Sequence, residues 1–320
     1  MSRLLLNLTF VFIVVAASKA VTAEDVAAAQ PAGKGERVVY LREQPHISRV
    51  PLKVVDPVDV TIAKGGDTYV ADRVGEVIFR VDAWGDVSLI GEDLAGLSRV
   101  SRSAFGTFAL LASRGSGEIV QLSNNGFRSG THLPFRPAGL AIDGGGVAYV
   151  TKAASGELYR LDPDGGLKQV TSVSEPTLDL AINSLGTVYM LLRSGKVVTV
   201  FPDGQSKEVK GYLPEATTRI AIEPNSGDIV GLAKDVDEKS ALYRATKTHD
   251  EVVRFASVVR GTSAFAFDKL GNLTLASPDL RAITQVKTHF RVPSPETGEP
   301  FLLILSPNAP VRGEEDSESF

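Results

Sequence analysis

The hydrophobic and polar positions of this chain alternate in short runs separated by turn residues. The stretch from Pro137 to Gly165 holds one complete unit, with an apolar run at 140–142, a glycine turn at 144–146, a second apolar run at 147–151 and an alternating run at 158–161. Asp162-Pro163-Asp164-Gly165 then favours a hairpin turn, because proline presets φ for a type I turn and glycine accepts positive φ. The pattern predicts short β-strands joined by tight turns.

The same unit recurs along the chain. Steps of 40 residues from Leu140 reach Val60, Val100, Leu180 and Ile220, and a further 45 residues reach Phe265. Glycine lies six residues after five of these apolar anchors, at Gly66, Gly106, Gly146, Gly186 and Gly271, and Gly227 lies one place late. Repetition at a fixed phase indicates a repeat architecture. Six units of about four short strands predict an all-β fold, a six-bladed β-propeller of four-stranded blades.

The repeats run near 57–96, 97–136, 137–176, 177–216, 217–261 and 262–292, within a propeller expected over 37–306. The last repeat lacks a clear fourth strand, which would leave an open edge. Three strand-like segments outside the repeats, 37–41, 47–55 and 301–305, are candidates to close the ring. A solenoid of leucine-rich repeats would need a shorter period, and helical repeats would need a period of about 3.6 residues.

The two ends of the chain have different compositions from the repeats. Residues 1–23 resemble a secretory signal peptide, with Arg3, an apolar core at 4–17 and small residues before the end. That core is shorter than the roughly 20 residues needed to span a bilayer, so we expect export, to the periplasm or exterior, with no stable membrane anchor. Residues 24–36 are expected to be a flexible linker and residues 307–320 a disordered acidic tail.

The bulk composition excludes several functions. The chain contains no cysteine, which excludes disulfides and a thiol nucleophile. The formal net charge is −4, and loss of Arg3 and Lys19 with the leader leaves 32 basic against 38 acidic residues, or −6. This balance disfavours nonspecific binding to nucleic acid.

The blade pattern resembles a known family. PAGLAIDGGGVAYVTKAASGELYRLDPDG at 137–165 and PVDVTIAKGGDTYVADRVGEVIFRVDAWG at 57–85 resemble the NHL repeat and the wider group of six-bladed propellers that includes the SMP-30/gluconolactonase-like enzymes. The resemblance covers about residues 57–292. It is specific for the fold and says little about function, since the group includes lactonases, a lyase, protein-binding modules and scaffolds.

In the lactonase-like branch, the resemblance implies a divalent metal at the mouth of the central channel, held by carboxylate and Asn side chains that include a Glu of the first blade. The equivalent positions here, one before each anchor, are Asp59, Arg99, Gly139, Asp179, Arg219 and Ala264. Two arginines at these positions would repel a hard cation, and no Glu or Asn occupies them. We therefore expect structural ion pairs between neighbouring blades, Asp59 with Arg99 and Asp179 with Arg219, and neither a metal nor another cofactor.

Other catalytic constellations are not evident in the sequence. The four histidines, His46, His132, His249 and His289, fall at unrelated repeat positions without zinc-binding spacing. No serine lies in a GxSxG elbow. No catalytic residue is predicted.

A basic residue follows the second strand of every repeat. The six are Arg73, Arg114, Lys152, Arg193, Lys234 and Arg281. One interpretation is local pairing with the glutamates that follow three of them, Glu76, Glu118 and Glu157, which contributes little. The other is a basic face for an anionic partner. The two function hypotheses are an exported noncatalytic propeller that binds a protein, a glycan or another anionic partner, and an SMP-30-like metal-dependent hydrolase or lyase with a divergent channel.

Overall fold

The computed structural model describes residues 27–32, 36–41, 45–103, 106–112, 115–123, 128–162, 165–234, 239–246, 252–293 and 300–305. The predicted signal peptide (1–23) and acidic tail (307–320) lie outside the described residues. Within these ranges the chain forms strands and turns, and no helix there is long and apolar enough to cross a membrane. The chain divides into two compact units, one of residues 45–289 and one of residues 1–44 with 290–320.

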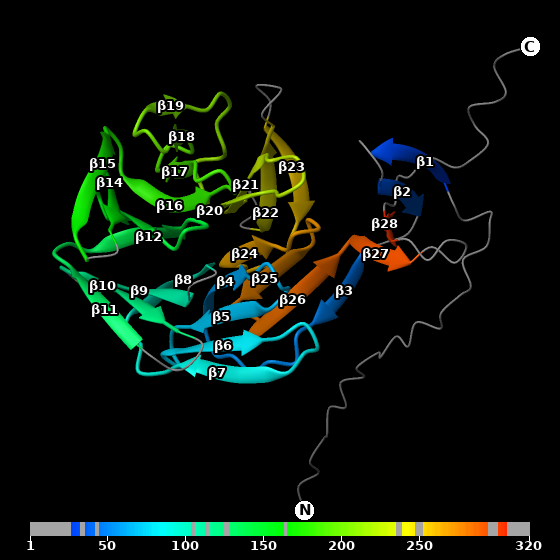
Figure 1. Ribbon diagram of the computed structural model, residues 1–320, viewed down its shortest axis with the longest axis horizontal. Helices are drawn as coiled ribbons and strands as arrows, with labels where there is room; N and C mark the ends of the chain where they lie inside the picture. The colour runs from blue at the N-terminus through cyan, green and yellow to red at the C-terminus, as the bar shows by residue number, and fades with distance from the viewer. Residues whose placement is uncertain are drawn as a thin grey trace, which may run out of the picture. The chain divides into compact units, whose positions relative to one another are not determined.

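The unit of residues 45–289 is an all-β, six-bladed propeller, as the sequence predicts (Figure 1). The first three blades are β4 (Pro57–Ile62), β5 (Thr68–Asp72), β6 (Val77–Val81) and β7 (Val87–Gly91); β8 (Leu97–Ser103), β9 (Gly106–Ala112), β10 (Gly117–Leu122) and β11 (Arg128–Leu133); and β12 (Pro137–Ile142), β13 (Ala148–Lys152), β14 (Gly156–Leu161) and β15 (Leu167–Val173). The next two are β16 (Thr177–Ile182), β17 (Val188–Leu192), β18 (Val197–Val200) and β19 (Ser206–Glu208); and β20 (Thr217–Ile222), β21 (Ile229–Lys234), β22 (Ser240–Ala245) and β23 (Val252–Ser257). The first strand of each blade is innermost, and these strands contact one another in order around the ring.

The sixth blade takes its outer strand from the N-terminal side of the propeller. It consists of β24 (Ala264–Phe267), β25 (Leu273–Ser277), β26 (Ala282–Lys287) and β3 (His46–Arg49). β3 pairs antiparallel with β26, with Ile47 opposite Val286. Residues within the segment 47–55 therefore supply the missing strand, and no open edge is left on β26.

The other candidate closing segments form a separate sheet. β2 (Glu36–Leu41) pairs in parallel with β28 (Pro300–Leu305), in a sheet ordered β1-β2-β28-β27 with β1 (Ala27–Ala32) and β27 (His289–Pro293). Residues 37–41 and 301–305 thus pair with each other rather than with the sixth blade, whose fourth position β3 occupies. Part of the expected linker, residues 27–32, is also a strand. Its Ala-rich sequence gave no strand signal, but pairing with β2 supplies its hydrogen bonds, and an edge position tolerates Pro31.

Among the described residues of the propeller, the core consists of six hydrophobic clusters, each between two neighbouring blades. One cluster joins Leu158 of the third blade to Met190 of the fourth, and both side chains are fully buried. Another joins Val60 of the first blade to Ile283 of the sixth. Because every blade buries its two faces against its neighbours, the ring is stabilised by contacts between adjacent repeats.

The tight turn that the repeated glycine predicts does follow the innermost strand. In the third blade, Asp143 Oδ1 accepts hydrogen bonds of 2.9 Å from the amides of Gly145 and Val147. Gly146 has φ of 86°, a conformation that favours glycine. These turns hold the ends of the innermost strands at the mouth of the central channel.

Candidate functional site

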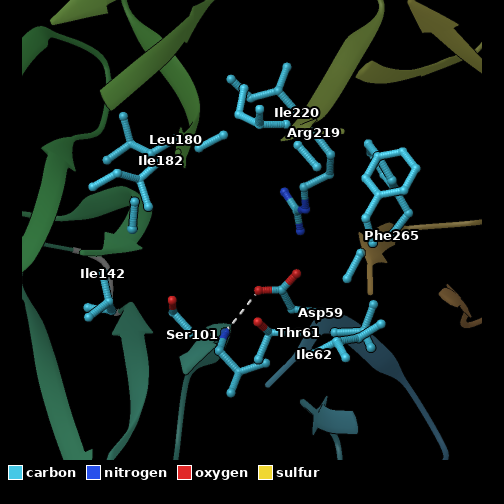
Figure 2. Close-up of a pocket in the computed structure, with 18 of the residues that line it drawn as sticks. Asp59, Thr61, Ile62, Ser101, Ile142, Leu180, Ile182, Arg219, Ile220 and Phe265 are labelled. Carbon is cyan, nitrogen blue, oxygen red and sulfur yellow. Dashed lines mark hydrogen bonds between the residues drawn. The ribbon is translucent and has the colours of Figure 1, made fainter. Parts of the chain in front are cut away.

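The innermost strands of all six blades enclose a cavity of about 340 Å³ (Figure 2). Side chains alternate along a strand, so residues that face the channel are two apart. The first ring of such positions, here called the charged layer, holds Asp59, Arg99, Gly139, Asp179, Arg219 and Ala264. The next ring toward the strand ends is small and largely apolar, with Thr61, Ser101, Ala141, Ala181, Ala221 and Ala266.

A β-bulge precedes each charged side chain of this layer. The pairing of β4 with β5 shifts between Pro57 and Asp59, which leaves Val58 without a partner residue. The same shift on three other innermost strands leaves Ser98, Leu178 and Thr218 unpaired. A bulge redirects side chains and interrupts the ladder. Four backbone carbonyls near the channel are therefore available to other donors.

The two arginines bind these four carbonyls. Arg99 donates from Nη1 to the carbonyl of Ser98 at 2.9 Å and from Nη2 to that of Leu178 at 3.4 Å. Arg219 donates from Nη1 to the carbonyl of Thr218 at 3.4 Å and from Nη2 to that of Val58 at 3.2 Å. Each guanidinium thus connects its own strand with the innermost strand two blades further on.

The two carboxylates bind the backbone of the following blade. Asp59 Oδ2 accepts a hydrogen bond of 2.9 Å from the amide of Val100 (Figure 2), and Asp179 Oδ2 accepts one of 3.0 Å from the amide of Ile220. These bonds tie the first blade to the second and the fourth to the fifth.

The ion pairing differs from the expectation. Arg99 pairs with Asp179, with 3.2 Å between Nε and Oδ1, and this contact joins the second blade to the fourth rather than to the first. The expected pairs between adjacent blades do not form in the described structure. The reason is that backbone amides occupy the near carboxylate oxygens, while the long arginine side chains are drawn across the channel to the bulge carbonyls.

The charged layer has an approximate two-fold repeat with one difference between its halves. The order acid, arginine, small residue occurs in the first three blades and again in the last three. Asp179 receives the Nε–H of Arg99, whereas Nε of Arg219 is buried and has no hydrogen-bond partner in the described part of the chain. One buried donor of the layer is thus unsatisfied, an unusual state for a native interior.

Burial and the neighbouring charges shift two pKa values in this layer. Burial raises the pKa of the Asp59 carboxyl, although the positive charges of Arg219 and Arg99 oppose the shift. Burial, with repulsion from Arg99, lowers the pKa of Arg219 to about 10. Arg219 therefore keeps its positive charge at neutral pH.

The residues of the channel do not fit the divalent metal that the resemblance implies. A hard cation needs several oxygen ligands free to converge. Here Asp59 and Asp179 are each hydrogen-bonded to a backbone amide and lie beside guanidinium groups. Within the described ranges, no group of three or more His, Cys, Asp and Glu side chains is placed to hold a metal ion.

Two lysines that the sequence analysis did not single out also line the cavity. Lys64 and Lys269 lie in the turns after the innermost strands of the first and sixth blades. Both stand four residues after an apolar anchor, Val60 and Phe265, so the repeat register contained a signal for them.

The five basic loop residues that the structure describes, all but Arg114, lie on the other side of the propeller from this cavity. They follow the second strand of each blade, whose end pairs with the start of the innermost strand, as in the pair Pro57 and Asp72. The cavity is lined toward the opposite ends of the innermost strands, through residues such as Ile62 and Ala63. The basic residues and the cavity are therefore separate features.

Two of the basic residues are engaged in local ion pairs. Arg73 pairs with Asp56 at 2.8 Å, rather than with the expected Glu76. Lys152 pairs with Glu157 at 2.9 Å, as the local interpretation predicts. Three more are exposed, Arg193, Lys234 and Arg281, and Arg114 lies outside the described residues. Their role in binding stays a prediction.

Known structures resemble this chain in fold at low sequence identity. Virginiamycin B lyase from Staphylococcus aureus has 10% identity and a TM-score of 0.57 over 76% of this chain and 99% of that chain. A gluconolactonase from Xanthomonas campestris has 13% identity and a TM-score of 0.57 over 77% and 91%. An auxiliary nutrient binding protein from Bacteroides thetaiotaomicron has 10% identity and a TM-score of 0.56 over 73% and 69%.

These structures define the class of fold. The structural neighbours are SMP-30/gluconolactonase-like and related six-bladed propellers. No protein-family model and no curated protein sequence matches the chain. Because the neighbours include a lyase, a lactonase and a binding protein, function has to be argued from the site itself.

Proposed function

We propose that this protein is a noncatalytic binding propeller whose central cavity takes a small molecule through an anionic oxygen group, such as a carboxylate or phosphate. The observation that carries the proposal is the state of Arg219. Its guanidinium projects into the cavity (Figure 2), and its Nε–H is buried and has no partner among the described residues. Asp179 is already bound by Arg99. An anionic oxygen would satisfy this donor through a charge-assisted hydrogen bond.

The rest of the cavity supports this ligand class. Lys64 and Lys269 add two positive charges to the lining. The nearby carboxylate of Asp268 is engaged in its own turn, where Oδ1 accepts hydrogen bonds from the amides of Leu270 and Asn272. The remaining wall is mostly aliphatic, which suits a ligand with a small apolar body and one charged end.

Ligand-induced thermal stabilisation tests the proposal. A panel of monocarboxylates, dicarboxylates and inorganic phosphate is titrated against the purified protein, and a ligand at 100 times its dissociation constant stabilises the fold by about 2.7 kcal/mol. Arg219→Met should abolish the stabilisation, and Lys64→Met, in an exposed turn, should weaken it. Arg193→Met, on the opposite face, is the matched control and should bind normally. Stabilisation that survives Arg219→Met, or none with any probe, would contradict the proposal.

The second candidate is a hydrolase or lyase, favoured by the fold shared with a lyase and a gluconolactonase. It requires catalytic chemistry that the charged layer does not provide in its present arrangement, because both carboxylates are hydrogen-bonded and no metal-ligand group is assembled among the described residues. Metal analysis of the purified protein, together with a lactone-opening assay, separates the candidates. Stoichiometric divalent metal and an activity that Asp179→Asn removes would establish the enzyme.

Export belongs to the same proposal and rests on the leader-like sequence of residues 1–23. The mature protein should begin after Ala23. Mass spectrometry of the N-terminus measures this directly, and a cytoplasmic protein that retains Met1 would refute it.

A further inference from the structure

A second cavity of about 360 Å³ lies between the first and sixth blades. It is here called the interblade cavity. Its lining comes from β3, β5, β25 and β26 and from the turn between β6 and β7. Its volume is within the range of about 300–1,000 Å³ that small-molecule sites occupy.

A row of polar side chains crosses the sixth blade at this cavity. Thr274 lies opposite Gln285 in the pairing of β25 with β26, and Gln285 lies opposite Ser48 in the pairing of β26 with β3. Elsewhere the faces between blades are filled by apolar clusters, including the cluster with Ile283 on the same strand. The polar row therefore interrupts an otherwise hydrophobic packing surface.

These polar groups have no partners within the protein as described. The side chains of Ser48, Thr68, Thr274 and Gln285 line the cavity and make no hydrogen bond to another described residue. Thr68 and Thr274 are each only 2% exposed. Their free donors and acceptors face the cavity and are available to a ligand.

The only tryptophan of the chain stands at the edge of this cavity. Trp84 is 91% exposed and lies in the turn between β6 and β7. The turn is rigidly built, because Asp82 Oδ1 accepts hydrogen bonds of 2.9 Å from the amides of Trp84 and Asp86. A single exposed apolar side chain is ordinary. Here, however, the ring borders a cavity with several unpartnered polar groups.

We infer that the interblade cavity is a carbohydrate-binding site. A pyranose ring has an apolar C–H face that packs on an aromatic ring and hydroxyls that both donate and accept hydrogen bonds. Trp84 supplies the ring, and Thr68, Thr274 and Gln285 supply matching donors and acceptors. Lys287 and Arg49 also line the cavity, and the carboxylates of Asp82 and Asp268 in the lining accept hydrogen bonds within their own turns. The positive charge of Lys287 would favour an acidic sugar.

The lone tryptophan makes the test specific. Glucose, galactose, mannose, N-acetylglucosamine and glucuronate are titrated to roughly 100 mM, a range that detects dissociation constants of about 10 mM. At least one sugar should change the Trp84 emission saturably. Calorimetry on variants then gives affinities. Trp84→Ala should weaken binding about tenfold, and Gln285→Ala about three- to tenfold.

Matched controls lie on distant blades. Tyr212→Ala removes another exposed aromatic ring, and Gln169→Ala removes an exposed glutamine of the third blade; both should leave binding unchanged. No saturable emission change with any of the five sugars would overturn the inference. Two other outcomes would also overturn it: binding that depends on Trp84 but not on Gln285, and a dimer that dissociates in the Trp84→Ala variant. Either outcome would mean that the Trp84 ring makes a surface contact and does not serve the cavity. Preference for glucuronate that Lys287→Met removes would establish the acidic subclass.

Discussion

The near two-fold repeat of the charged layer allows one substitution to be compared at two equivalent places. Asp59→Asn and Asp179→Asn each remove a negative charge and keep a side-chain oxygen for the amide of the next blade. The positions differ in their ion pairing, because Asp179 also receives the Nε–H of Arg99. A larger loss of stability in Asp179→Asn than in Asp59→Asn therefore tests that ion pair.

The structure sets the expected magnitudes. The side chains of Arg99 and Asp179 are 12% and 5% exposed, so Asp179→Asn leaves a nearly buried guanidinium without its counterion. Loss of one partner of a buried pair costs about 3–5 kcal/mol. For a unit of this size, 3 kcal/mol lowers Tm by roughly 6–12 °C. Asp59→Asn should cost no more than about 1 kcal/mol, because burial already disfavours the ionised form of Asp59.

Urea unfolding followed by circular dichroism measures both variants, since the exposed Trp84 is a poor reporter of unfolding. Arg99→Met in the Asp179→Asn background should recover part of the loss by removing the unpaired charge. Recovery should be incomplete, because the bulge carbonyl of Leu178 loses its donor. Equal destabilisation by Asp59→Asn and Asp179→Asn would refute the assigned ion pair.

Three further predictions follow from the described contacts. The raised pKa of Asp59 means that its carboxyl holds a proton more tightly in the folded state than in the unfolded state, where its pKa is near 3.8. Through this group the wild-type protein therefore loses stability as pH rises above that value, and Asp59→Asn should become more stable relative to wild type. Deletion of residues 24–44 should leave the Tm of the propeller almost unchanged, whereas deletion of 24–55 removes β3 and should lower it strongly. Arg193→Glu with Arg281→Glu should weaken retention on an anionic matrix, and the retention should fall steeply with added salt.

Each of these has a contradicting outcome. A stability difference for Asp59→Asn that does not vary with pH would mean that this carboxyl has an ordinary pKa in the folded state. Two truncations of equal stability would show that β3 does not close the ring. For the basic face, Arg128→Glu with Lys207→Glu is the control of equal charge change, and an equal loss from both pairs of variants would assign retention to net charge alone.

The local sequence was sufficient to predict the architecture. Apolar anchors at steps of 40 residues, with glycine turns at a fixed offset, predicted the six blades, because each blade is a local unit that buries its faces only against its neighbours. The same register placed Asp59, Arg99, Asp179 and Arg219 around the channel, where all four line the cavity.

Contacts between distant segments were decided by the tertiary structure. The expected ion pairs assumed that adjacent blades pair through their side chains, but bulges at residues such as Val58 redirected the arginines across the channel, and a bulge has no distinct signature in this sequence. Likewise, the strand composition of 37–41 and 47–55 did not show which segment would pair with β26. The interblade cavity appears only when Ser48 and Gln285, more than two hundred residues apart, become cross-strand neighbours beside Trp84. The repeat pattern determines the strands and turns of each blade, because these depend on residues close together in the sequence. Which polar groups face the interblade cavity depends instead on where the ring closes, which brings distant segments together.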